Sequence, residues 1–296
     1  MSPVLPSRRA LLAGALALVT VSARAETGSP RVAALDWTLA SACLSLGIVP
    51  AGVAEQRLYT HWVQDPALPA SVAELGLRTA PSLEGLAALE PDLILINALD
   101  EPLRARLERI APTLSLSIYG PERRPLALAA ETLRDLARRF GREAEAEAVI
   151  AGSERGFARC AAALAGSARP PVVVFAFEDA RHIRVYGQGS LFADVLGRLG
   201  LSSGWTGATS AWGTALAGID AVASLRDTML VAVDPIPADA RALIAGDGLW
   251  AALSAGRSSP LVTLPPVWAY GEVGAARRFA DLLTPALLSA EARHGS

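Results

Sequence analysis

The sequence predicts an α/β protein of two open lobes with mainly parallel sheets, joined by a single long backbone helix and with a ligand cleft between the lobes. Three observations predict this fold class. Short apolar strands alternate with amphipathic helices in both halves of the chain, a pattern typical of parallel sheets covered on both faces. A long proline-free helical segment, residues 142–166, separates the halves. Residues 82–96 and 218–232 share a helix-then-strand pattern without gaps, which indicates lobes of similar construction.

The first 25 residues are typical of a secretory signal peptide. Paired arginines at positions 8–9 precede an apolar run over residues 10–21, and residues 23–25 supply an A-x-A cleavage site. The run is too short to stay in a membrane as a span. The arginine pair resembles a twin-arginine signal, and the general secretion route is the alternative. We therefore expect a soluble, exported, periplasmic protein, cleaved near Ala25.

Composition excludes several classes of function. All 27 basic residues are arginine, so neither a Schiff-base lysine nor a Walker-type phosphate loop is possible. Removing residues 1–25 takes away three arginines and no acid, which leaves 24 basic and 29 acidic residues and a formal charge of −5. Because no basic cluster is present either, we expect no nucleic-acid partner.

Cysteine and histidine usage predicts no metal site built by the protein. Cys43 and Cys160 both fall on apolar helix faces, so we expect two buried free thiols, with a disulfide as the alternative for an exported chain. None of the three histidines has metal-ligand spacing to another histidine or to a cysteine. We expect no resident metal and no cofactor.

The N-terminal lobe is predicted to span residues 26–141. Its short apolar runs and amphipathic segments predict strands at 31–36, 51–55, 92–97 and 113–119, and helices at 38–46, 83–89, 102–110 and 126–140. Gly47 and Gly141 are placed to end two of these helices. Residues 56–70, rich in proline and polar side chains, are predicted to form a loop.

The connecting helix, residues 142–166, carries one apolar face and one charged face. The apolar face is Ala146, Ile150, Ser153, Phe157, Cys160 and Leu164, at alternating spacings of four and three. Its length of roughly 37 Å suits a strut between lobes, and a long surface helix of one domain is the alternative. Gly152 and Gly156 share one face, so we expect close packing there.

The C-terminal lobe is predicted to span residues 167–296. Strands are expected at 171–178, 182–187, 228–234 and 261–267, and helices at 190–201, 220–225 and 273–288, with two short helices before the last strand. Ser190 is a suitable N-cap. Residues 202–218, rich in small residues, are predicted to form a loop.

Candidate ligand residues lie in the loops that follow predicted strands, where open α/β sheets bind ligands. We expect ligand contact from Trp62, Trp205, Trp212, Trp268, Tyr270 and Arg78. Trp37, directly after the first strand, is expected to pack in the core or at its rim. No nucleophile elbow and no dinucleotide-binding fingerprint is present, so we do not expect an enzyme.

Seven stretches together resemble the ferric-hydroxamate siderophore-binding proteins of bacterial ABC importers, the ferrichrome-binding type. They are residues 34–54, 61–84, 108–112, 181–192, 204–213, 219–220 and 266–271. Each stretch is weak alone, but their order and spacing cover nearly the whole mature chain. The resemblance implies two α/β lobes joined by one long helix, with a shallow aromatic cleft between them.

The resemblance also implies roles for individual residues. Arg78 matches the arginine that donates to iron-bound hydroxamate oxygens, and the four tryptophans and one tyrosine expected to contact ligand match cleft positions. The siderophore already coordinates the iron, so no protein ligand to the metal is needed. Glu84 and Asp220 match lobe-tip acids that pair with arginines of the permease. The implied partners are a ferric siderophore, an inner-membrane ABC permease and its ATPase, and the protein is expected to be a monomer.

Three positions depart from the family pattern. Asp100 stands where the family has a tyrosine that reaches the hydroxamates, Ile96 replaces a cleft tryptophan, and Arg184 replaces an apolar wall residue. Our hypothesis is a more polar ferric siderophore that combines hydroxamate with carboxylate groups. Arg184 would suit the carboxylate, and Asp100 would suit a cationic or hydroxyl-bearing arm.

Two further functions stay open on the sequence. Binding proteins for a corrinoid or haem share the fold. Haem would need an axial tyrosine or histidine, and Tyr270 alone is weak evidence for such a ligand. An exported α/β enzyme such as a hydrolase is the candidate from another class. The sequence does not identify the siderophore or the permease.

Overall fold

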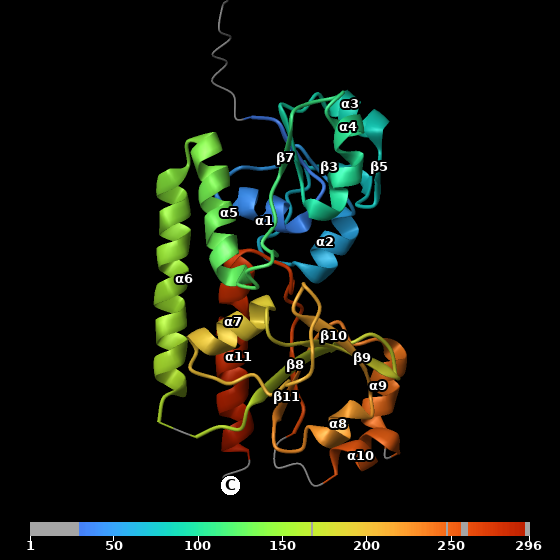
Figure 1. The fold of residues 1–296 in the computed structure, drawn as a ribbon, viewed down its shortest axis with the longest axis vertical. Helices are drawn as coiled ribbons and strands as arrows, with labels where there is room; N and C mark the ends of the chain where they lie inside the picture. The colour runs from blue at the N-terminus through green and yellow to red at the C-terminus, as the bar shows by residue number, and fades with distance from the viewer. Residues whose placement is uncertain (1–29, 167, 247, 256–259, 294–296) are drawn as a thin grey trace, which may run out of the picture.

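The computed structural model describes residues 30–166, 168–246, 248–255 and 260–293. The predicted signal peptide, residues 1–25, lies outside this part of the chain, so its cleavage and export route stay predictions. The two lobes follow one another along the long axis of the molecule, and helix α6 (Glu143–Leu164) runs along one side of both (Figure 1).

The N-terminal lobe is built on a five-stranded sheet in the order β3-β2-β1-β6-β7, with every neighbouring pair parallel. Its strands are β1 (Val32–Ala34), β2 (Gly52–Val53), β3 (Ala73–Glu74), β6 (Leu93–Ile96) and β7 (Thr113–Ser115), and β4 (Gly76–Leu77) and β5 (Ala80–Pro81) form a separate hairpin. Its helices are α1 (Trp37–Ser45), α2 (Gln56–Trp62), α3 (Leu83–Leu89), the 3-10 helix η1 (Ala98–Leu103), α4 (Arg104–Leu107) and α5 (Pro125–Phe140).

The C-terminal lobe repeats this strand order as β10-β9-β8-β11-β12, but β9 is antiparallel to both of its neighbours. Its strands are β8 (Val172–Phe177), β9 (His182–Tyr186), β10 (Thr214–Gly218), β11 (Met229–Val233) and β12 (Val262–Leu264). Its helices are α7 (Leu191–Arg198), α8 (Ala221–Ser224), α9 (Ala238–Ala245), α10 (Leu249–Ser254) and α11 (Val273–Ala292). The predicted fold class, two α/β lobes with mainly parallel sheets, is therefore confirmed.

The prediction of a loop at residues 56–70 was wrong for its first half, which forms α2. The carboxylate of Glu74 accepts a hydrogen bond at 3.0 Å from the backbone N–H of Gln56, at the start of this helix. Buried Tyr59 donates its hydroxyl to the carbonyl of Pro66 at 2.9 Å. Because Glu74 lies eighteen residues away in the sequence, the composition of the segment did not reveal this helix start.

Two further segments differ from the prediction. Residues 214–218 lie in the predicted loop but form β10, because they pair with β9 over five residues. The helix predicted at 102–110 is divided between η1 and α4. Asn97 and Asp100 form a capping box that starts η1 before Pro102, and this moves the helical segment toward the N-terminus.

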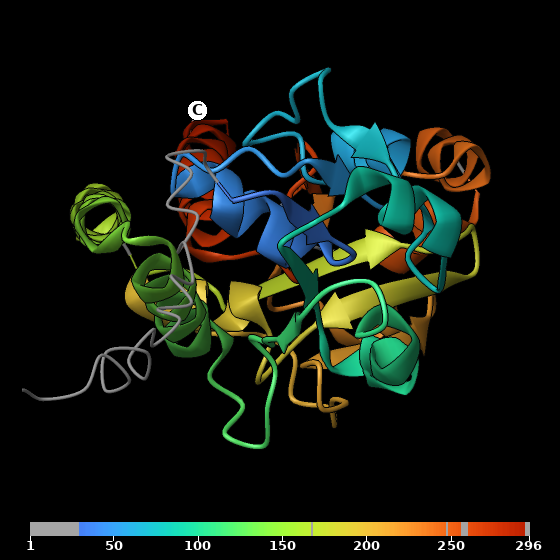
Figure 2. The same ribbon diagram turned by 90° about the horizontal axis from the view of Figure 1, so that it is seen from above.

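Helix α6 is one continuous helix, and the predicted apolar face is buried except at Ile150, which is partly exposed. It packs beside α5 and α11 at one side of the molecule (Figure 1, Figure 2). The guanidinium of Arg277 in α11 lies across buried Gly156 and donates to the carbonyl of Gly152 at 2.9 Å. The expected close packing is therefore confirmed at Gly156, where α11 is the element in contact, but not at Gly152, where a Cβ would meet its nearest neighbour at 3.9 Å.

Each lobe has apolar clusters on both faces of its sheet. Cys43 and Cys160 are buried free thiols, one in the core of each lobe, as predicted. Within the described ranges, no helix combines the length and the apolar character needed to cross a bilayer.

Candidate functional site

A cavity of about 530 Å³ lies between the lobes, and we call it the interlobe cavity. Residues of both lobes line it: Trp37, Leu58, Trp62, Arg78, Ala176, Phe177, Glu178, Arg184, Tyr186, Pro235, Ile236, Pro237, Trp268 and Tyr270. Five of the residues predicted from the sequence are among them, namely Trp62, Arg78, Arg184, Trp268 and Tyr270. The lining combines aromatic faces with two guanidinium groups, a composition suited to a ligand with both apolar and oxygen-rich surfaces.

Arg78 lies in the turn between β4 and β5 and is held by two contacts. Its guanidinium carbon lies 3.8 Å from the ring centroid of Trp37, and its Nε donates to the carboxylate of Glu55 at 2.9 Å. Among the described residues, its terminal nitrogens have no hydrogen-bond partner. One edge of the guanidinium fork is thus fixed, and the other can donate to planar oxygen groups.

The support for Arg78 comes from the carboxyl ends of β1 and β2. Trp37 opens α1, two residues beyond the end of β1, and is 1 % exposed. Its indole N–H donates to the carbonyl of Ala54 at 2.9 Å. The prediction that Trp37 packs in the core is therefore confirmed, although its ring also lines the cavity. Glu55 follows β2 in the left-handed backbone conformation, with φ 54°. Its N–H donates to the carbonyl of Gly76 at 2.9 Å, which ties it to the hairpin that carries Arg78.

Four aromatic rings lie together along one wall of the cavity. The ring centroid of Trp268 lies 4.9 Å from Trp37, 6.5 Å from Trp62 and 5.2 Å from Tyr270. Burial raises the pKa of Tyr270, although nearby Arg184 and Thr214 favour its ionised form. The phenol is therefore neutral at neutral pH and can donate a hydrogen bond.

Arg184 enters the cavity from β9 of the C-terminal lobe and is also paired with an acid. Its Nε donates to Glu178, the residue immediately after β8, with a separation of 2.5 Å. The pairing raises the pKa of Arg184, so the guanidinium stays charged. The side chains of both residues are 37 % exposed. The cavity thus has an arginine–glutamate pair on each lobe, Arg78 with Glu55 and Arg184 with Glu178.

Trp205 and Trp212, which were predicted to line the cleft, are not among the cavity residues. Trp205 packs with the apolar cluster of the C-terminal lobe, and its ring lies so close to Gly187 that a Cβ there would be 2.7 Å from it. Trp212 borders a separate narrow space of about 30 Å³. Its ring centroid lies 5.8 Å from that of Tyr270, so Trp212 supports a cavity residue from behind.

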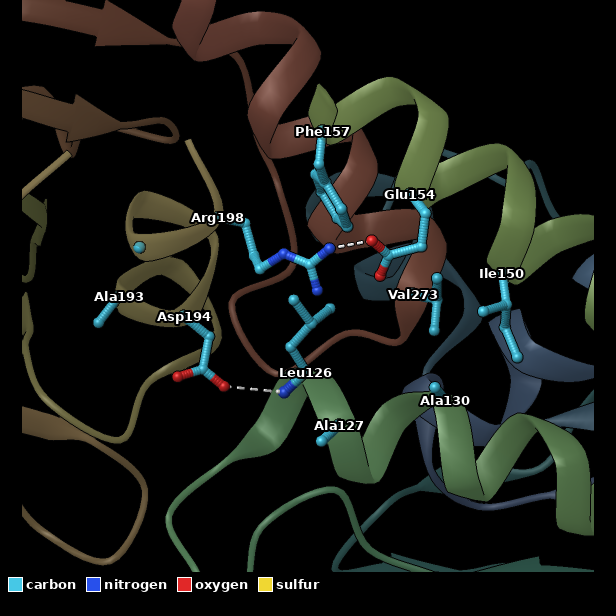
Figure 3. A pocket seen from close by; sticks show the side chains of 11 residues that line it. Leu126, Ala127, Ala130, Ile150, Glu154, Phe157, Ala193, Asp194, Arg198 and Val273 are labelled. Carbon is cyan, nitrogen blue, oxygen red and sulfur yellow. Dashed lines mark hydrogen bonds and ion pairs between the residues drawn. The ribbon is translucent and has the colours of Figure 1, made fainter. Parts of the chain in front are cut away.

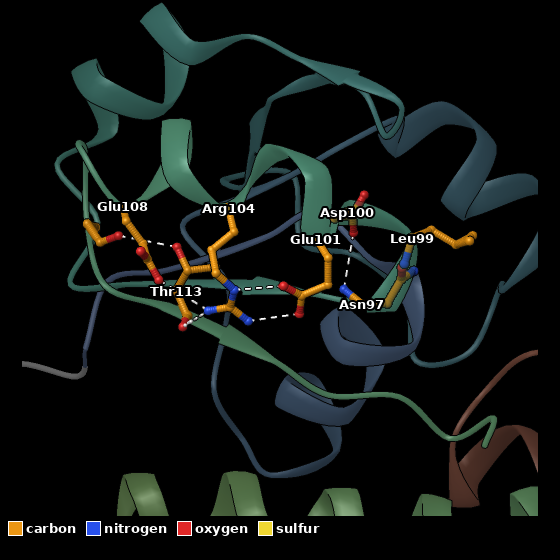
Figure 4. Close-up of polar contacts among 8 residues, drawn as sticks. Asn97, Leu99, Asp100, Glu101, Arg104, Glu108 and Thr113 are labelled. Carbon is orange, nitrogen blue, oxygen red and sulfur yellow. Dashed lines mark hydrogen bonds and ion pairs between the residues drawn. The ribbon is translucent and has the colours of Figure 1, made fainter. Parts of the chain in front are cut away.

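Asp100, also predicted at the cleft, is buried and serves as a structural cap (Figure 4). Its carboxylate accepts from the backbone N–H of Asn97 at 3.1 Å. The Asn97 side chain donates in turn to Asp36 at 2.8 Å, and Asp36 caps α1. Burial raises the pKa of Asp100, and the neighbouring Asp36 raises it further. Asp100 therefore has a structural role, because its carboxylate is used in this capping network.

Glu84 and Asp220, the predicted docking acids, are both exposed. Glu84 lies in the first turn of α3, and Asp220 immediately precedes α8. The two helices lie toward opposite ends of the molecule, one on each lobe (Figure 1). Neither acid forms an ion pair with another described residue, so both carboxylates are available to a partner.

A second hollow of about 460 Å³ lies among α5, α6, α7 and the start of α11 (Figure 3). Its polar groups are engaged with each other. Arg198 forms an ion pair with Glu154, and Asp194 accepts from the backbone N–H of Leu126 at 3.1 Å. The interlobe cavity offers the open edge of the Arg78 guanidinium and an indole wall, so we regard it as the better ligand site.

Sequence reasoning missed Glu55 and Glu178. Each directly follows the apolar part of a strand, so their positions were open to the same argument that selected the loop aromatics. No acid pair suited to general acid–base catalysis stands out in the sequence, and these two acids act differently, each by holding an arginine. Among the residues described, no group of three or more histidine, cysteine, aspartate or glutamate side chains could hold a metal ion.

The sequence is similar to those of known binding proteins. The sequence pattern of a family described as periplasmic binding protein matches residues 32–267. The iron(3+)-hydroxamate-binding protein FhuD of Escherichia coli K12 is 31% identical over 289 residues, which cover 96% of this chain and 97% of the relative. The achromobactin-binding periplasmic protein of Dickeya dadantii is 30% identical over 226 residues, covering 71% of this chain and 70% of the relative.

The fold is also similar to that of a solved siderophore-binding protein. The crystal structure of the siderophore-binding protein FhuD from Vibrio cholerae, with Fe3+-Desferal bound, matches with a TM-score of 0.84. The two sequences are 31% identical, and the match covers 89% of this chain and 99% of the other.

Proposed function

Because the chain belongs to the periplasmic binding protein family, we propose that it captures a ferric siderophore of the hydroxamate type and delivers it to an ABC importer for iron uptake. The observation that carries this proposal is the interlobe cavity, in which Arg78 is fixed over Trp37 beside an aromatic wall. The relatives support the ligand class, since E. coli FhuD is named for iron(3+)-hydroxamate and V. cholerae FhuD was solved with Fe3+-Desferal.

The chemistry of a ferric hydroxamate fits the cavity. The chelate surrounds the iron with hydroxamate oxygens, which accept hydrogen bonds from a guanidinium fork. Its hydrocarbon edges can lie against indole and phenol rings. The siderophore satisfies the coordination sphere of the metal, so the protein contributes no ligand to iron. A volume of about 530 Å³ also lies within the range typical of small-molecule sites.

We propose that five of the residues predicted from the sequence contact the chelate. Arg78 donates to the hydroxamate oxygens, Trp62, Trp268 and Tyr270 supply the aromatic wall, and Arg184 faces them from the C-terminal lobe. Trp212 acts through its contact with Tyr270. We do not assign ligand contact to Trp205 or Asp100, since packing and helix capping account for them.

We further propose that two exposed acids direct delivery of the chelate to the permease. Glu84 and Asp220 are exposed acids on opposite lobes, which supports a docking surface that reads both lobes at once. Pairing with arginines of an inner-membrane permease would hold the cavity over the translocation path, and the ATPase would drive release. We infer a monomeric protein, exported by the predicted signal peptide.

The hypothesis of a ligand that combines hydroxamate with carboxylate groups depends on Arg184 and Asp100. Arg184 lines the cavity, as that hypothesis requires. It is already paired with Glu178, however, and Asp100 is occupied as a cap. A hydrolase gains no support from relatives that are named as binding proteins. Binding proteins for haem and for corrinoids share this fold, so both ligands belong among the probes of a binding test.

Titration of the purified mature protein, followed by tryptophan fluorescence, tests the proposal. The probes are ferric ferrichrome, ferric ferrioxamine, an aerobactin-type and a citrate-type ferric chelate, haem and a corrinoid. We expect saturable tight binding of at least one hydroxamate chelate, and no binding of the iron-free siderophores at the same concentrations. Tight binding of haem or the corrinoid alone, or turnover of an ester panel without chelate binding, would refute the proposal.

A further inference from the structure

Both arginines of the interlobe cavity are neutralised by a glutamate. Arg78 pairs with Glu55 at 2.9 Å, and Arg184 pairs with Glu178 at 2.5 Å. No other charged side chain is among the described residues that line the cavity. The two pairs together carry no net charge, so the cavity offers guanidinium N–H donors without an excess of positive charge.

An unpaired arginine and a paired arginine select different ligands. Both can donate hydrogen bonds to neutral oxygen groups. An unpaired guanidinium also attracts any anion, whereas the carboxylate of a pair repels it over a similar distance. Glu178 itself lines the cavity, so an anionic arm placed on Arg184 would also meet the carboxylate. The pairs therefore favour a neutral ligand over a polyanionic one.

The hairpin that carries Glu178 does not depend on the glutamate side chain. The backbone N–H of Glu178 donates to the carbonyl of His182 at 3.0 Å. The carboxylate of Asp179 accepts from the N–H groups of Arg181 and His182 at 2.6 and 2.8 Å. These bonds hold the turn, and the Glu178 side chain is left partly exposed at the cavity wall. A purely structural role would not require a charged group there.

Glu55 is held toward Arg78 at a conformational cost. A left-handed backbone at a residue other than glycine costs of the order of 1 kcal/mol or more, and Glu55 adopts it with φ 54°. The neighbouring Glu74 carboxylate accepts from the Glu55 N–H at 3.0 Å, which helps to keep this geometry. Strained residues cluster at functional sites, so this backbone is consistent with selection for the position of the carboxylate.

We propose that Glu178, with Glu55 as a weaker second contributor, is a specificity determinant that makes the interlobe cavity favour neutral ferric hydroxamate chelates over polyanionic ferric chelates. This inference rests on the proposed function and adds the charge class of the ligand to it. Glu178 acts directly at the cavity wall. Glu55 acts from behind Arg78, both by orienting the guanidinium and by offsetting its charge.

The test compares the Kd of a neutral chelate, ferric ferrichrome, with that of an anionic chelate, ferric aerobactin, in each variant. The substitution Glu178→Gln keeps an oxygen for Arg184 and removes one negative charge. We expect it to shift the ratio of the two Kd values about tenfold toward the anionic chelate. Glu55→Gln should shift the ratio in the same direction but less. Added salt should reduce both shifts, because it screens the partly exposed charges.

The matched control is Glu108→Gln. Glu108 is also paired with an arginine, Arg104, at 3.2 Å, but it does not line the cavity (Figure 4). This variant removes the same charge elsewhere on the N-terminal lobe, so its Kd ratio should equal that of the wild type. A shift as large as that of Glu178→Gln would mean that net charge alone acts, and would overturn the proposal.

A wild-type measurement keeps the proposal testable even if a variant fails to fold. The affinity of the unmodified protein for ferric aerobactin should be weaker than for ferric ferrichrome and should change little from low to high salt. A tight affinity for the anion that falls steeply with salt would indicate an unpaired positive site and overturn the proposal, as would an unchanged Kd ratio in folded Glu178→Gln. If neither chelate nor any other ferric siderophore binds the wild type, it is the proposed function that fails.

Discussion

The two lobes share a strand order but differ in strand direction. In each lobe the first strand lies at the centre of a five-stranded sheet, with the next two strands on one side and the last two on the other. The N-terminal sheet is wholly parallel, whereas β9 runs antiparallel to both β8 and β10 in the C-terminal sheet. The symmetry of the molecule therefore extends to strand order and not to the way the site is built.

Connection length explains the difference. Helix α1 lies between β1 and β2, which allows the crossover that parallel strands need. Only residues 178–181 lie between β8 and β9, so these strands form a hairpin and are antiparallel. The hairpin brings Glu178 and Arg184, six residues apart, to the same cavity wall. The N-terminal lobe reaches the equivalent pair by joining Glu55 and Arg78 from separate segments.

The lobes are also in contact outside the connecting helix. Thr38 donates to the carbonyl of Tyr270 at 2.5 Å, and Tyr119 donates to the carbonyl of Ala269 at 3.0 Å. Asp194 of α7 accepts from the first turn of α5. Because α6 is one continuous helix and these bonds join the lobes directly, we expect the lobes to rock slightly rather than close widely.

The largest expected effect tests whether the lobes are equivalent in docking. We expect Glu84→Arg combined with Asp220→Arg to abolish uptake of the ferric chelate while the Kd for the chelate stays unchanged, because both acids lie away from the cavity. Each single reversal should reduce uptake to a similar extent if the lobes dock equivalently. Uptake of a radiolabelled chelate by cells that express the permease measures this. Normal uptake by the double variant would exclude the docking role.

The second largest effect concerns stability and depends on Glu272, a buried acid that caps the start of α11. It is 1 % exposed, and burial raises its pKa from 4.5 to about 7. The folded protein therefore holds this proton up to a pH at which the unfolded chain has released it. The free energy of unfolding should fall by roughly 3 kcal/mol between about pH 4.5 and pH 7 from this group.

Urea denaturation between pH 4.5 and pH 8 measures this dependence, with Glu272→Gln as the comparison. The variant cannot ionise at this position, so it should lack that part of the slope and gain on the wild type as the pH rises. Parallel pH profiles for the two proteins would assign the slope to other groups.

The third effect compares the two cavity arginines directly. Arg78→Ala should weaken binding of a neutral ferric hydroxamate by roughly 1.5–3 kcal/mol, the loss expected for hydrogen bonds from a charged donor. Arg184→Ala should cost less than about 1 kcal/mol with the same ligand, because Arg78 is also held over the ring of Trp37 at 3.8 Å and is therefore the better oriented donor. Fluorescence titration gives both values, and the thermal midpoints should stay near that of the wild type. Equal losses at the two positions would show that the lobes bind the chelate equally.

The smallest effect tests how the lobes are joined. Alanine at Gly152 meets its nearest neighbour at 3.9 Å, whereas a Cβ at Gly156 would lie 2.3 Å from Arg277. Gly152→Ala should therefore stabilise the protein through helix propensity, and Gly156→Ala should lose the Arg277 contact. The two variants should differ by roughly 1–2 kcal/mol in the free energy of unfolding. Denaturant titration measures it, and equal stabilities would mean that Arg277 moves aside without cost.

The fold class, the order of most elements and the long helix could all be predicted from the sequence. These follow from the period of apolar residues and from local signals such as Gly141 and Ser190, which act within one or two turns of chain. The sequence also predicted Arg78 as a ligand donor, through its resemblance to the family, and the structure places this residue in the lining of the interlobe cavity. Five of the eight ligand residues predicted from the sequence line the interlobe cavity.

The remaining features could not be predicted from the sequence, because each depends on partners far apart in the chain. Glu74 starts α2 from eighteen residues away, and the chain reversal after β8 places Glu178 against Arg184. Asp100 is held as a cap by a network that also includes Asp36 and Asn97. The charge balance of the cavity, which we propose selects the ligand, arises from such long-range pairs.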